Sequence, residues 1–196
     1  MDNQRQNENL LKLLVTSWPN LISLGRLLSV PLLIWLILSN HMFLAFIGCL
    51  LAALSDAADG FVARILKSQS KIGAYLDPLA DKVLLAGLYC TLSYKGFIMP
   101  WLVIMIVFRD FLIIGGTVFL MMLKKNFAVR PLMISKINTL FQIAAIAWIL
   151  CNLGLELSAP EIITQLLLSG VALTTFLSGA AYVVVWLKHL AQQEIQ

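Results

Sequence analysis

Four aspartates lie at regular spacing in an otherwise apolar chain. Asp56 and Asp59 are three residues apart, and Asp77 and Asp81 are four residues apart. On a helix, either spacing places both members of a pair on one face. Carboxylate oxygens suit hard divalent ions such as Mg²⁺, Mn²⁺ or Ca²⁺, and a carboxylate beside such an ion can also accept a proton. We call these residues the four-aspartate motif and interpret it as a metal centre.

The residues between the two pairs indicate what such a centre would act on. Gly60, Ala63 and Gly73 are small, and Arg64 carries a planar, permanently charged fork that suits phosphate. The pattern predicts a slot for a bulky phosphate-bearing group. The structural alternative is a set of buried salt bridges between the aspartates and neighbouring basic residues, which are Arg64, Lys67, Lys71 and Lys82. Ionisable residues within membrane helices are functional by default, so four at regular spacing favour the metal site.

The elements that hold this motif are predicted to be membrane helices. The chain has 196 residues, of which 60% are hydrophobic and only 12% charged, against about 25% charged in a soluble domain. This composition excludes a soluble enzyme, a disordered protein and a nucleic-acid binder. Apolar stretches long enough to cross a bilayer predict six spans, at 21–39, 42–66, 76–95, 99–123, 132–152 and 162–187.

The predicted fold is therefore an all-α integral membrane protein with one domain over residues 1–196. Residues 1–18 are expected to form a short amphipathic helix on the membrane surface, and residues 19–190 a six-span bundle. With both termini in the cytoplasm, eleven of the fourteen Lys and Arg residues lie on the cytoplasmic side. The positive-inside rule thus places both termini and the four-aspartate motif there, in a cell inner membrane or on the matrix side of an organellar one.

At this point the sequence resembles a known family. The run Asp56-x2-Asp59-Gly60-x2-Ala63-Arg64-x8-Gly73-x3-Asp77-x3-Asp81 is similar to the signature of the CDP-alcohol phosphotransferases. The resemblance implies an enzyme that moves the phosphatidyl group of CDP-diacylglycerol to an alcohol and releases CMP. It also implies two divalent metal ions, Mg²⁺ or Mn²⁺, held by the four aspartates, with Asp81 as the catalytic base. The CDP-lipid would be bound at Asn20, Ser23, Asp56, Gly60, Ala63, Arg64, Ser70 and Gly73. A homodimer is an expectation of the same kind.

The acceptor alcohol should be decided by the fourth and fifth spans. Arg109 and Lys136 are cations within or beside apolar stretches, and with Arg130 and Asn138 they form the predicted acceptor site. For Arg109 the structural alternative is pairing with Asp110 or with the four-aspartate motif. Phosphatidylglycerophosphate synthases tend to carry Gly-Lys-x-Lys-Thr where this chain has Ser-Lys-Ile-Asn-Thr at 135–139.

The second lysine of that pattern is thus Asn138. The pattern, with the Thr174-Thr175 to Tyr182 stretch, resembles the eukaryotic-type cardiolipin synthases more closely. A phosphodiester acceptor such as phosphatidylglycerol carries one negative charge, and glycerol 3-phosphate nearly two, so the loss of a cation favours the phosphodiester. Glycerol 3-phosphate remains the alternative acceptor.

A divalent-cation transporter is the alternative from another functional class. It could place aspartate pairs at a metal site, but it would not need Gly60, Ala63, Arg64 and Gly73 at their positions. Transporters of this kind also tend to show matched halves with broken helices, and this sequence has no internal repeat. CMP release from CDP-diacylglycerol distinguishes the two hypotheses.

Overall fold

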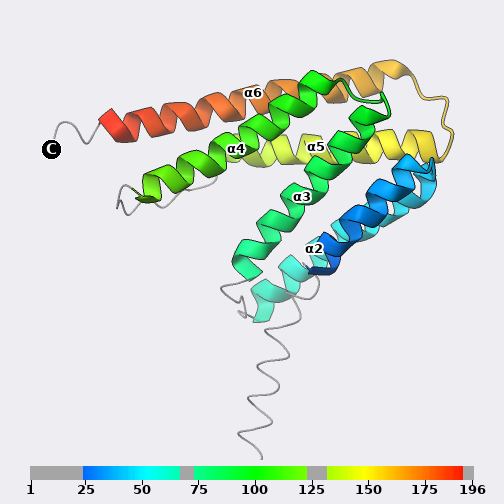
Figure 1. Cartoon of the computed structure of the whole chain (residues 1–196), viewed down its shortest axis with the longest axis horizontal. Coiled ribbons are helices and arrows are strands. Elements are labelled where there is room, and N and C mark those ends of the chain that lie inside the picture. The colour runs from blue at the N-terminus through cyan, green and yellow to red at the C-terminus, as the bar shows by residue number, and fades with distance from the viewer. Residues whose placement is uncertain (1–23, 67–72, 123–131, 192–196) are drawn as a thin grey trace, which may run out of the picture. The chain divides into compact units, whose positions relative to one another are not determined.

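The computed structural model describes residues 24–66, 73–122 and 132–191, and this part of the chain is helical. Side chains are described for 24–55, 79–117 and 132–188. A first helix, Leu24–Leu38, precedes five labelled helices (Figure 1), which are α2 (Met42–Leu66), α3 (Gly73–Tyr94), α4 (Pro100–Met122), α5 (Met133–Gly154) and α6 (Glu161–Ala191). The predicted surface helix at 1–18 lies outside the described residues.

Each predicted span coincides with one of these helices to within a few residues. Three segments are long and apolar enough to cross a membrane, namely Pro100–Thr117, Met133–Gly154 and Glu161–Lys188. Two shorter apolar helical segments, Leu24–Leu38 and Met42–Ser55, precede them. The described structure therefore has the helices of a membrane protein, and six crossings stay a prediction.

Three connections between helices are short because each helix ends in the same capping motif. In this motif a residue with a left-handed backbone follows the helix, and the next N–H donates to a carbonyl five residues earlier. The left-handed residues are Asn40 (φ 62°), Gly96 (φ 83°) and Glu156 (φ 49°). The closing bonds are His41 N to Leu36 O, Phe97 N to Leu92 O and Leu157 N to Asn152 O, of 2.9, 3.0 and 3.0 Å.

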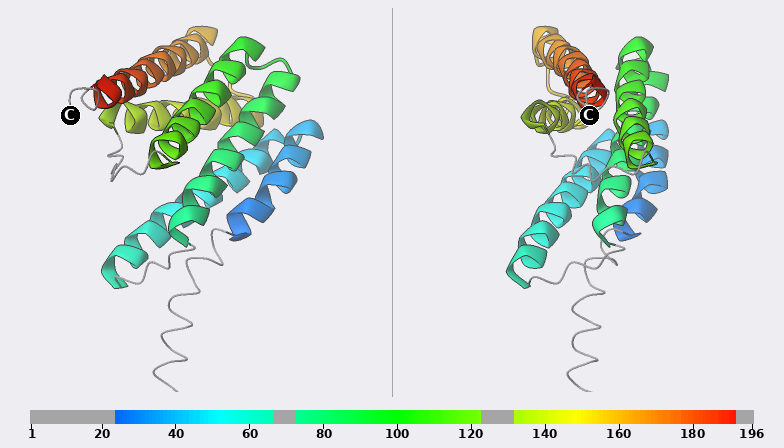
Figure 2. Two further views of the ribbon diagram at one scale, coloured as in Figure 1. Left: turned by 60° about the vertical axis from the view of Figure 1, so that its left-hand side comes forward. Right: turned by 90° about the vertical axis from the view of Figure 1, so that its left-hand side faces the viewer.

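The chain divides into two compact units, each described here by itself. Unit 1 comprises Met1–Thr91 with Leu153–Leu155, and unit 2 comprises Leu92–Asn152 with Glu156–Gln196. Within unit 1 the first helix runs beside α2 and α3 (Figures 1 and 2), and glycines allow the close approach. A Cβ on Gly48 of α2 would lie 2.7 Å from Leu33 Cδ2, and one on Gly87 of α3 would lie 3.2 Å from Val30 Cγ1. These two contacts place the first helix against both of its neighbours.

Unit 2 is built from α4, α5 and α6. Glycines again mark the contacts, because a Cβ on Gly170 of α6 would lie 2.7 Å from Phe141 Cε1 of α5, and one on Gly116 of α4 would collide with the Trp186 ring of α6. Trp148 of α5 donates a hydrogen bond of 3.1 Å to Thr164 Oγ1 of α6. Small residues at helix contacts are the usual means by which membrane helices pack closely.

Candidate active site

The four-aspartate motif lies on two helices of unit 1. Asp56 and Asp59 belong to the second half of α2, and Asp77 and Asp81 belong to the first turns of α3. The last turns of α2 and the first turns of α3 lie at the same end of unit 1, which is also where the first helix begins (Figures 1 and 2). The helix positions of the predicted motif are thus confirmed. Of its four side chains the structure describes that of Asp81.

Asp81 forms an ion pair that was not predicted from the sequence. Arg26 Nη1, on the first helix, donates a hydrogen bond to Asp81 Oδ1 across 55 residues of chain. The arginine side chain is 3% exposed and the aspartate side chain 44% exposed. The carboxylate therefore has a buried cationic partner and a side that further ligands can reach.

The predicted CDP-lipid residues fall at the same helix ends. Gly60, Ala63 and Arg64 belong to the last turns of α2, and Gly73 is the first residue of α3. The remaining predicted residues of this group, Asn20, Ser23 and Ser70, lie outside the described residues.

The donor set of the motif suits a hard divalent ion. Among the side chains that the structure describes, no three His, Cys, Asp or Glu residues gather into a metal site, and three of the four motif carboxylates are not among those side chains. The described member, Asp81, is an accessible carboxylate that already binds a cation, the Arg26 guanidinium. An oxygen-only set of this type fits Mg²⁺ or Mn²⁺.

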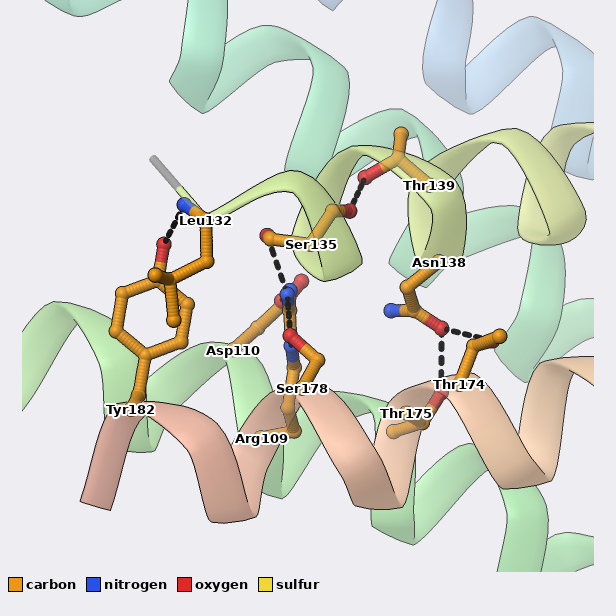
Figure 3. A network of polar contacts seen from close by, with 10 residues as sticks. All are labelled: Arg109, Asp110, Leu132, Ser135, Asn138, Thr139, Thr174, Thr175, Ser178 and Tyr182. Carbon is orange, nitrogen blue, oxygen red and sulfur yellow. Dashed lines mark hydrogen bonds and ion pairs between the residues drawn. The ribbon is translucent and has the colours of Figure 1, made fainter. Parts of the chain in front are cut away.

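In unit 2, Arg109 of α4 ties three helices together (Figure 3). Its Nη1 donates to the neighbouring Asp110 at 2.7 Å. Its Nη2 donates to Ser135 of α5 and to Ser178 of α6, and its Nε donates to the same Ser178 hydroxyl at 3.2 Å. Arg109 is 5% exposed and Ser178 is fully buried. Of the two sequence-based explanations for Arg109, pairing with Asp110 is thus present, and the serine contacts were not foreseen.

Asn138 lies one turn after Ser135 on α5 and is fully buried. Its Oδ1 accepts hydrogen bonds from Thr175 Oγ1 at 2.8 Å and from Thr174 Oγ1 at 2.9 Å, both on α6 (Figure 3). Thr174 Oγ1 also lies 2.7 Å from the Gly170 carbonyl oxygen. Within the described part of the chain, the buried Asn138 Nδ2 has no hydrogen-bond partner. If the amide were turned over, Nδ2 would donate to the threonines and Oδ1 would be left over instead, so in either orientation one end of the amide remains available.

Of the other predicted acceptor residues, Lys136 differs from Asn138 in exposure. Lys136 is exposed on the first turns of α5, and Arg130 lies outside the described residues. Tyr182 of α6 accepts a hydrogen bond from the Leu132 backbone N–H at 3.4 Å, which holds the start of α5 against α6 (Figure 3). The structure thus brings Arg109 and Asn138 into one polar row along α5 and α6, with Ser135, Ser178 and the two threonines.

Comparison with known proteins decides the family. The model of the CDP-alcohol phosphatidyltransferases matches residues 16–188, which is most of the chain. The chain belongs to this family. The match includes the whole four-aspartate motif and the polar row of unit 2.

Relatives in the family carry two different names. The chain is 37% identical, over 146 residues, to the chloroplastic CDP-diacylglycerol–glycerol-3-phosphate 3-phosphatidyltransferase 1 of Oryza sativa subsp. japonica, which covers 66% of this chain and 44% of that protein. It is 36% identical, over 186 residues, to the cardiolipin synthase (CMP-forming) of Rattus norvegicus, which covers 84% of this chain and 59% of that protein. The chain thus spans about half the length of these two relatives.

Proposed function

We propose that this protein transfers the phosphatidyl group of CDP-diacylglycerol to phosphatidylglycerol, giving cardiolipin and CMP. The family supports the first half of this statement, because its members act on CDP-linked alcohols. Relatives named for glycerol 3-phosphate and relatives named cardiolipin synthase both match the chain, so the choice of acceptor rests on particular residues.

The transfer itself needs an activated hydroxyl and a stabilised leaving group. The acceptor oxygen forms a bond to the phosphatidyl phosphorus, and the bond from that phosphorus to the CMP oxygen breaks. Asp81, whose carboxylate is partly exposed, would take the proton of the attacking hydroxyl. Arg64 would neutralise charge on the departing CMP.

Mg²⁺ or Mn²⁺ ions held by Asp56, Asp59, Asp77 and Asp81 would supply neutralisation of the pyrophosphate charge when bound. The residues at the same helix ends would bind the CDP part of the donor, namely Asn20, Ser23, Gly60, Ala63, Arg64, Ser70 and Gly73. Glycine and alanine there leave room for the backbone to approach the nucleotide.

The assignment of phosphatidylglycerol as the acceptor rests on the environment of Asn138. Its amide is fully buried and is bound by two uncharged hydroxyls, Thr174 and Thr175. Phosphatidylglycerophosphate synthases tend to have a second lysine at this position, which their acceptor, with nearly two negative charges, would use. A neutral amide held by two hydroxyls places no cation in this part of the predicted acceptor site, which suits a lipid acceptor with a single charge. For that charge the proposed partners are Lys136 and Arg130, whereas Arg109, which is 5% exposed, would shape the acceptor site by holding Ser135 and Ser178.

The hydrogen bonds of Asn138 connect two sequence features that lie far apart in the chain. The asparagine at 138 and the threonine pair at 174–175 both resemble the cardiolipin synthase branch, and the structure shows that their side chains bond to each other. A change at one position therefore alters the surroundings of the other. This coupling supports their action as one determinant of acceptor choice.

The test is a panel of acceptors offered one at a time. Purified protein in detergent is given CDP-diacylglycerol, Mg²⁺ or Mn²⁺, and either phosphatidylglycerol or glycerol 3-phosphate, and the lipid product is identified. We expect cardiolipin from phosphatidylglycerol. Efficient formation of phosphatidylglycerophosphate, without cardiolipin from added phosphatidylglycerol, would show that glycerol 3-phosphate is the acceptor.

A matched pair of variants adds a test of the charge argument. Asn138→Lys introduces a cation between the threonine hydroxyls, so we expect the ratio of cardiolipin to phosphatidylglycerophosphate formed to fall. Thr139→Val serves as the control, because the Thr139 hydroxyl bonds the Ser135 carbonyl of its own helix and its loss should leave this ratio unchanged. An unchanged ratio in Asn138→Lys, with the variant folded and active, would contradict the role of position 138.

A further inference from the structure

Arg26 is a buried charge that has no assigned role in the proposed reaction. It lies in the first turn of the described part of the first helix and is 5% exposed as a residue. Its guanidinium bonds Asp81 Oδ1. In the sequence it is simply a lone arginine within an apolar stretch. A buried arginine in a membrane helix is costly, and such residues are retained for a partner or a function.

The ion pair is asymmetric, and the asymmetry indicates its purpose. The arginine side chain is 3% exposed, so it has almost no surface with which to contact a substrate, whereas the Asp81 side chain is 44% exposed. A salt bridge that served only to join two helices could be replaced by apolar side chains at little or no loss of stability. Here the fixed, buried end is the cation, and the accessible end is the carboxylate of the four-aspartate motif.

Arg26 also differs from Arg109, the other buried arginine among the described side chains. Arg109 uses its N–H groups on an adjacent aspartate and on two serines of neighbouring helices, which is the pattern of a cross-link. Arg26 bonds a carboxylate that is distant in sequence and lies in the family signature. A carboxylate has two oxygens with about four lone-pair positions, so a carboxylate that accepts from a guanidinium can also accept a proton or bind an ion, and the Asp81 side chain is 44% exposed.

We propose that Arg26 is a positioning residue for Asp81, which holds the carboxylate in the orientation in which it takes the proton of the acceptor hydroxyl. This rests on the proposed role of Asp81 as the base. The planar guanidinium fixes a direction as well as a charge, which a lysine ammonium on a flexible stem does not do equally well. Arg26 acts through Asp81 and touches neither substrate.

The test compares turnover with metal binding in Arg26→Gln and Arg26→Lys. For Arg26→Gln we expect kcat to fall by about 10- to 100-fold, the usual effect of losing a group that orients an active-site ligand. The KM for CDP-diacylglycerol should stay unchanged, because the arginine side chain is buried. Arg26→Lys should recover part of the lost kcat, because its ammonium can still donate to the carboxylate.

A measurement of metal binding distinguishes a loss of Asp81 positioning from a general disruption of the site. Mn²⁺ binding to the substrate-free protein in detergent is measured by electron paramagnetic resonance of the free ion. The loss of Arg26 removes no metal ligand and takes away a charge that repels a cation. Arg26→Gln should therefore bind Mn²⁺ at least as tightly as the wild type while its kcat is lower. Arg109→Gln, which also removes a buried arginine, is the matched control for Mn²⁺ affinity.

Two results would overturn the proposal. One is a wild-type kcat in Arg26→Gln. The other is a parallel loss of kcat and Mn²⁺ binding in this variant, which would mean that Arg26 maintains the site as a whole. Turnover is assayed with whichever acceptor the wild type uses, so a wrong acceptor assignment does not affect the comparison. If the wild type itself binds no Mn²⁺, the proposed metal centre fails, and Arg26 is still judged by its kcat and by the recovery in Arg26→Lys.

Discussion

Replacement of Arg109 by methionine should loosen unit 2. The arginine donates to Ser135 on α5, to Ser178 on α6 and to Asp110 on its own helix, so one side chain connects three helices (Figure 3). Methionine fills a similar volume and donates nothing. The variant therefore lacks the interhelical bonds and the ion pair with Asp110 while the apolar packing is largely kept.

The expected destabilisation follows from the hydrogen bonds that methionine cannot form. Interhelical hydrogen bonds within membranes contribute about 0.6 kcal/mol on average and about 1.7 kcal/mol at most. Bonds to a charged donor in a buried setting belong to the upper part of that range, and the variant lacks the bonds to both serines as well as the ion pair. We therefore expect Arg109→Met to lower the free energy of unfolding by about 2–4 kcal/mol.

A double-mutant cycle isolates the Arg109–Ser178 contact. Ser178→Ala alone should cost about 1 kcal/mol, because the serine hydroxyl accepts from both Nε and Nη2. In the double variant with Arg109→Met, the serine change should cost almost nothing more, since its partner is already absent. Thr117→Val, on α4 like Arg109, is the control. The Thr117 hydroxyl bonds the Ile113 carbonyl of its own helix.

The assay is unfolding of the purified protein in mixed micelles with an increasing fraction of sodium dodecyl sulfate, followed by far-ultraviolet circular dichroism. Additive costs of Arg109→Met and Ser178→Ala would refute the contact. Unfolding of Arg109→Met at the wild-type detergent fraction would refute the role of Arg109 as a cross-link. In that case the residue would keep only its proposed role at the acceptor site.

Three further predictions concern packing, metal and orientation. Gly116→Ala should destabilise the protein by about 1–2 kcal/mol in the same unfolding assay, since its Cβ meets the Trp186 ring; Gly115→Ala, with open space around its Cβ, should be neutral or slightly stabilising, and equal effects of the two changes would contradict the contact. Chelation of divalent metal, and asparagine at any position of the four-aspartate motif, should each nearly abolish CMP release, and full turnover in a strong chelator would refute the metal centre. Cysteines placed at Lys71 and Lys95 should label from opposite sides of the membrane, with Lys71 in the cytoplasm, and labelling of both from one side would contradict six crossings.

Much of the fold could be predicted because each helix is indicated by its own stretch of sequence. Apolar stretches bounded by charges and turn residues predicted every described helix to within a few residues, since hydrophobic length is the main signal for a membrane helix. The tight connection at Gly96 is similarly local, because glycine tolerates the left-handed backbone that ends α3. Asn40 and Glu156 also have the left-handed backbone. Glutamate has no particular preference for this conformation, so the sequence alone does not predict it at Glu156.

The partners of the buried polar residues could not be predicted in the same way. Arg26 and Asp81 are 55 residues apart, and which residues of two helices meet depends on how each helix is rotated in the packed unit. Ser135 and Ser178 carried no signal, because serine within an apolar helix is more often a small packing residue than a ligand of arginine. A general rule, that intramembrane charges have a partner or a function, was the one available indication for Arg26.

Arg26 and Arg109, both buried in the described part of the chain, show why that rule needs a structure to be useful. Both are single cations in apolar stretches, and both bond an aspartate. Arg109 pairs with its neighbour, and its remaining bonds go to serines that have no other evident use, so its loss should appear first in stability. Arg26 pairs with a distant carboxylate that is far more exposed than itself, so its loss should appear first in turnover. The exposure of the acidic partner, 44% for Asp81 against 22% for Asp110, distinguishes them, because a carboxylate that works on a substrate must be reachable and one that only joins helices need not be.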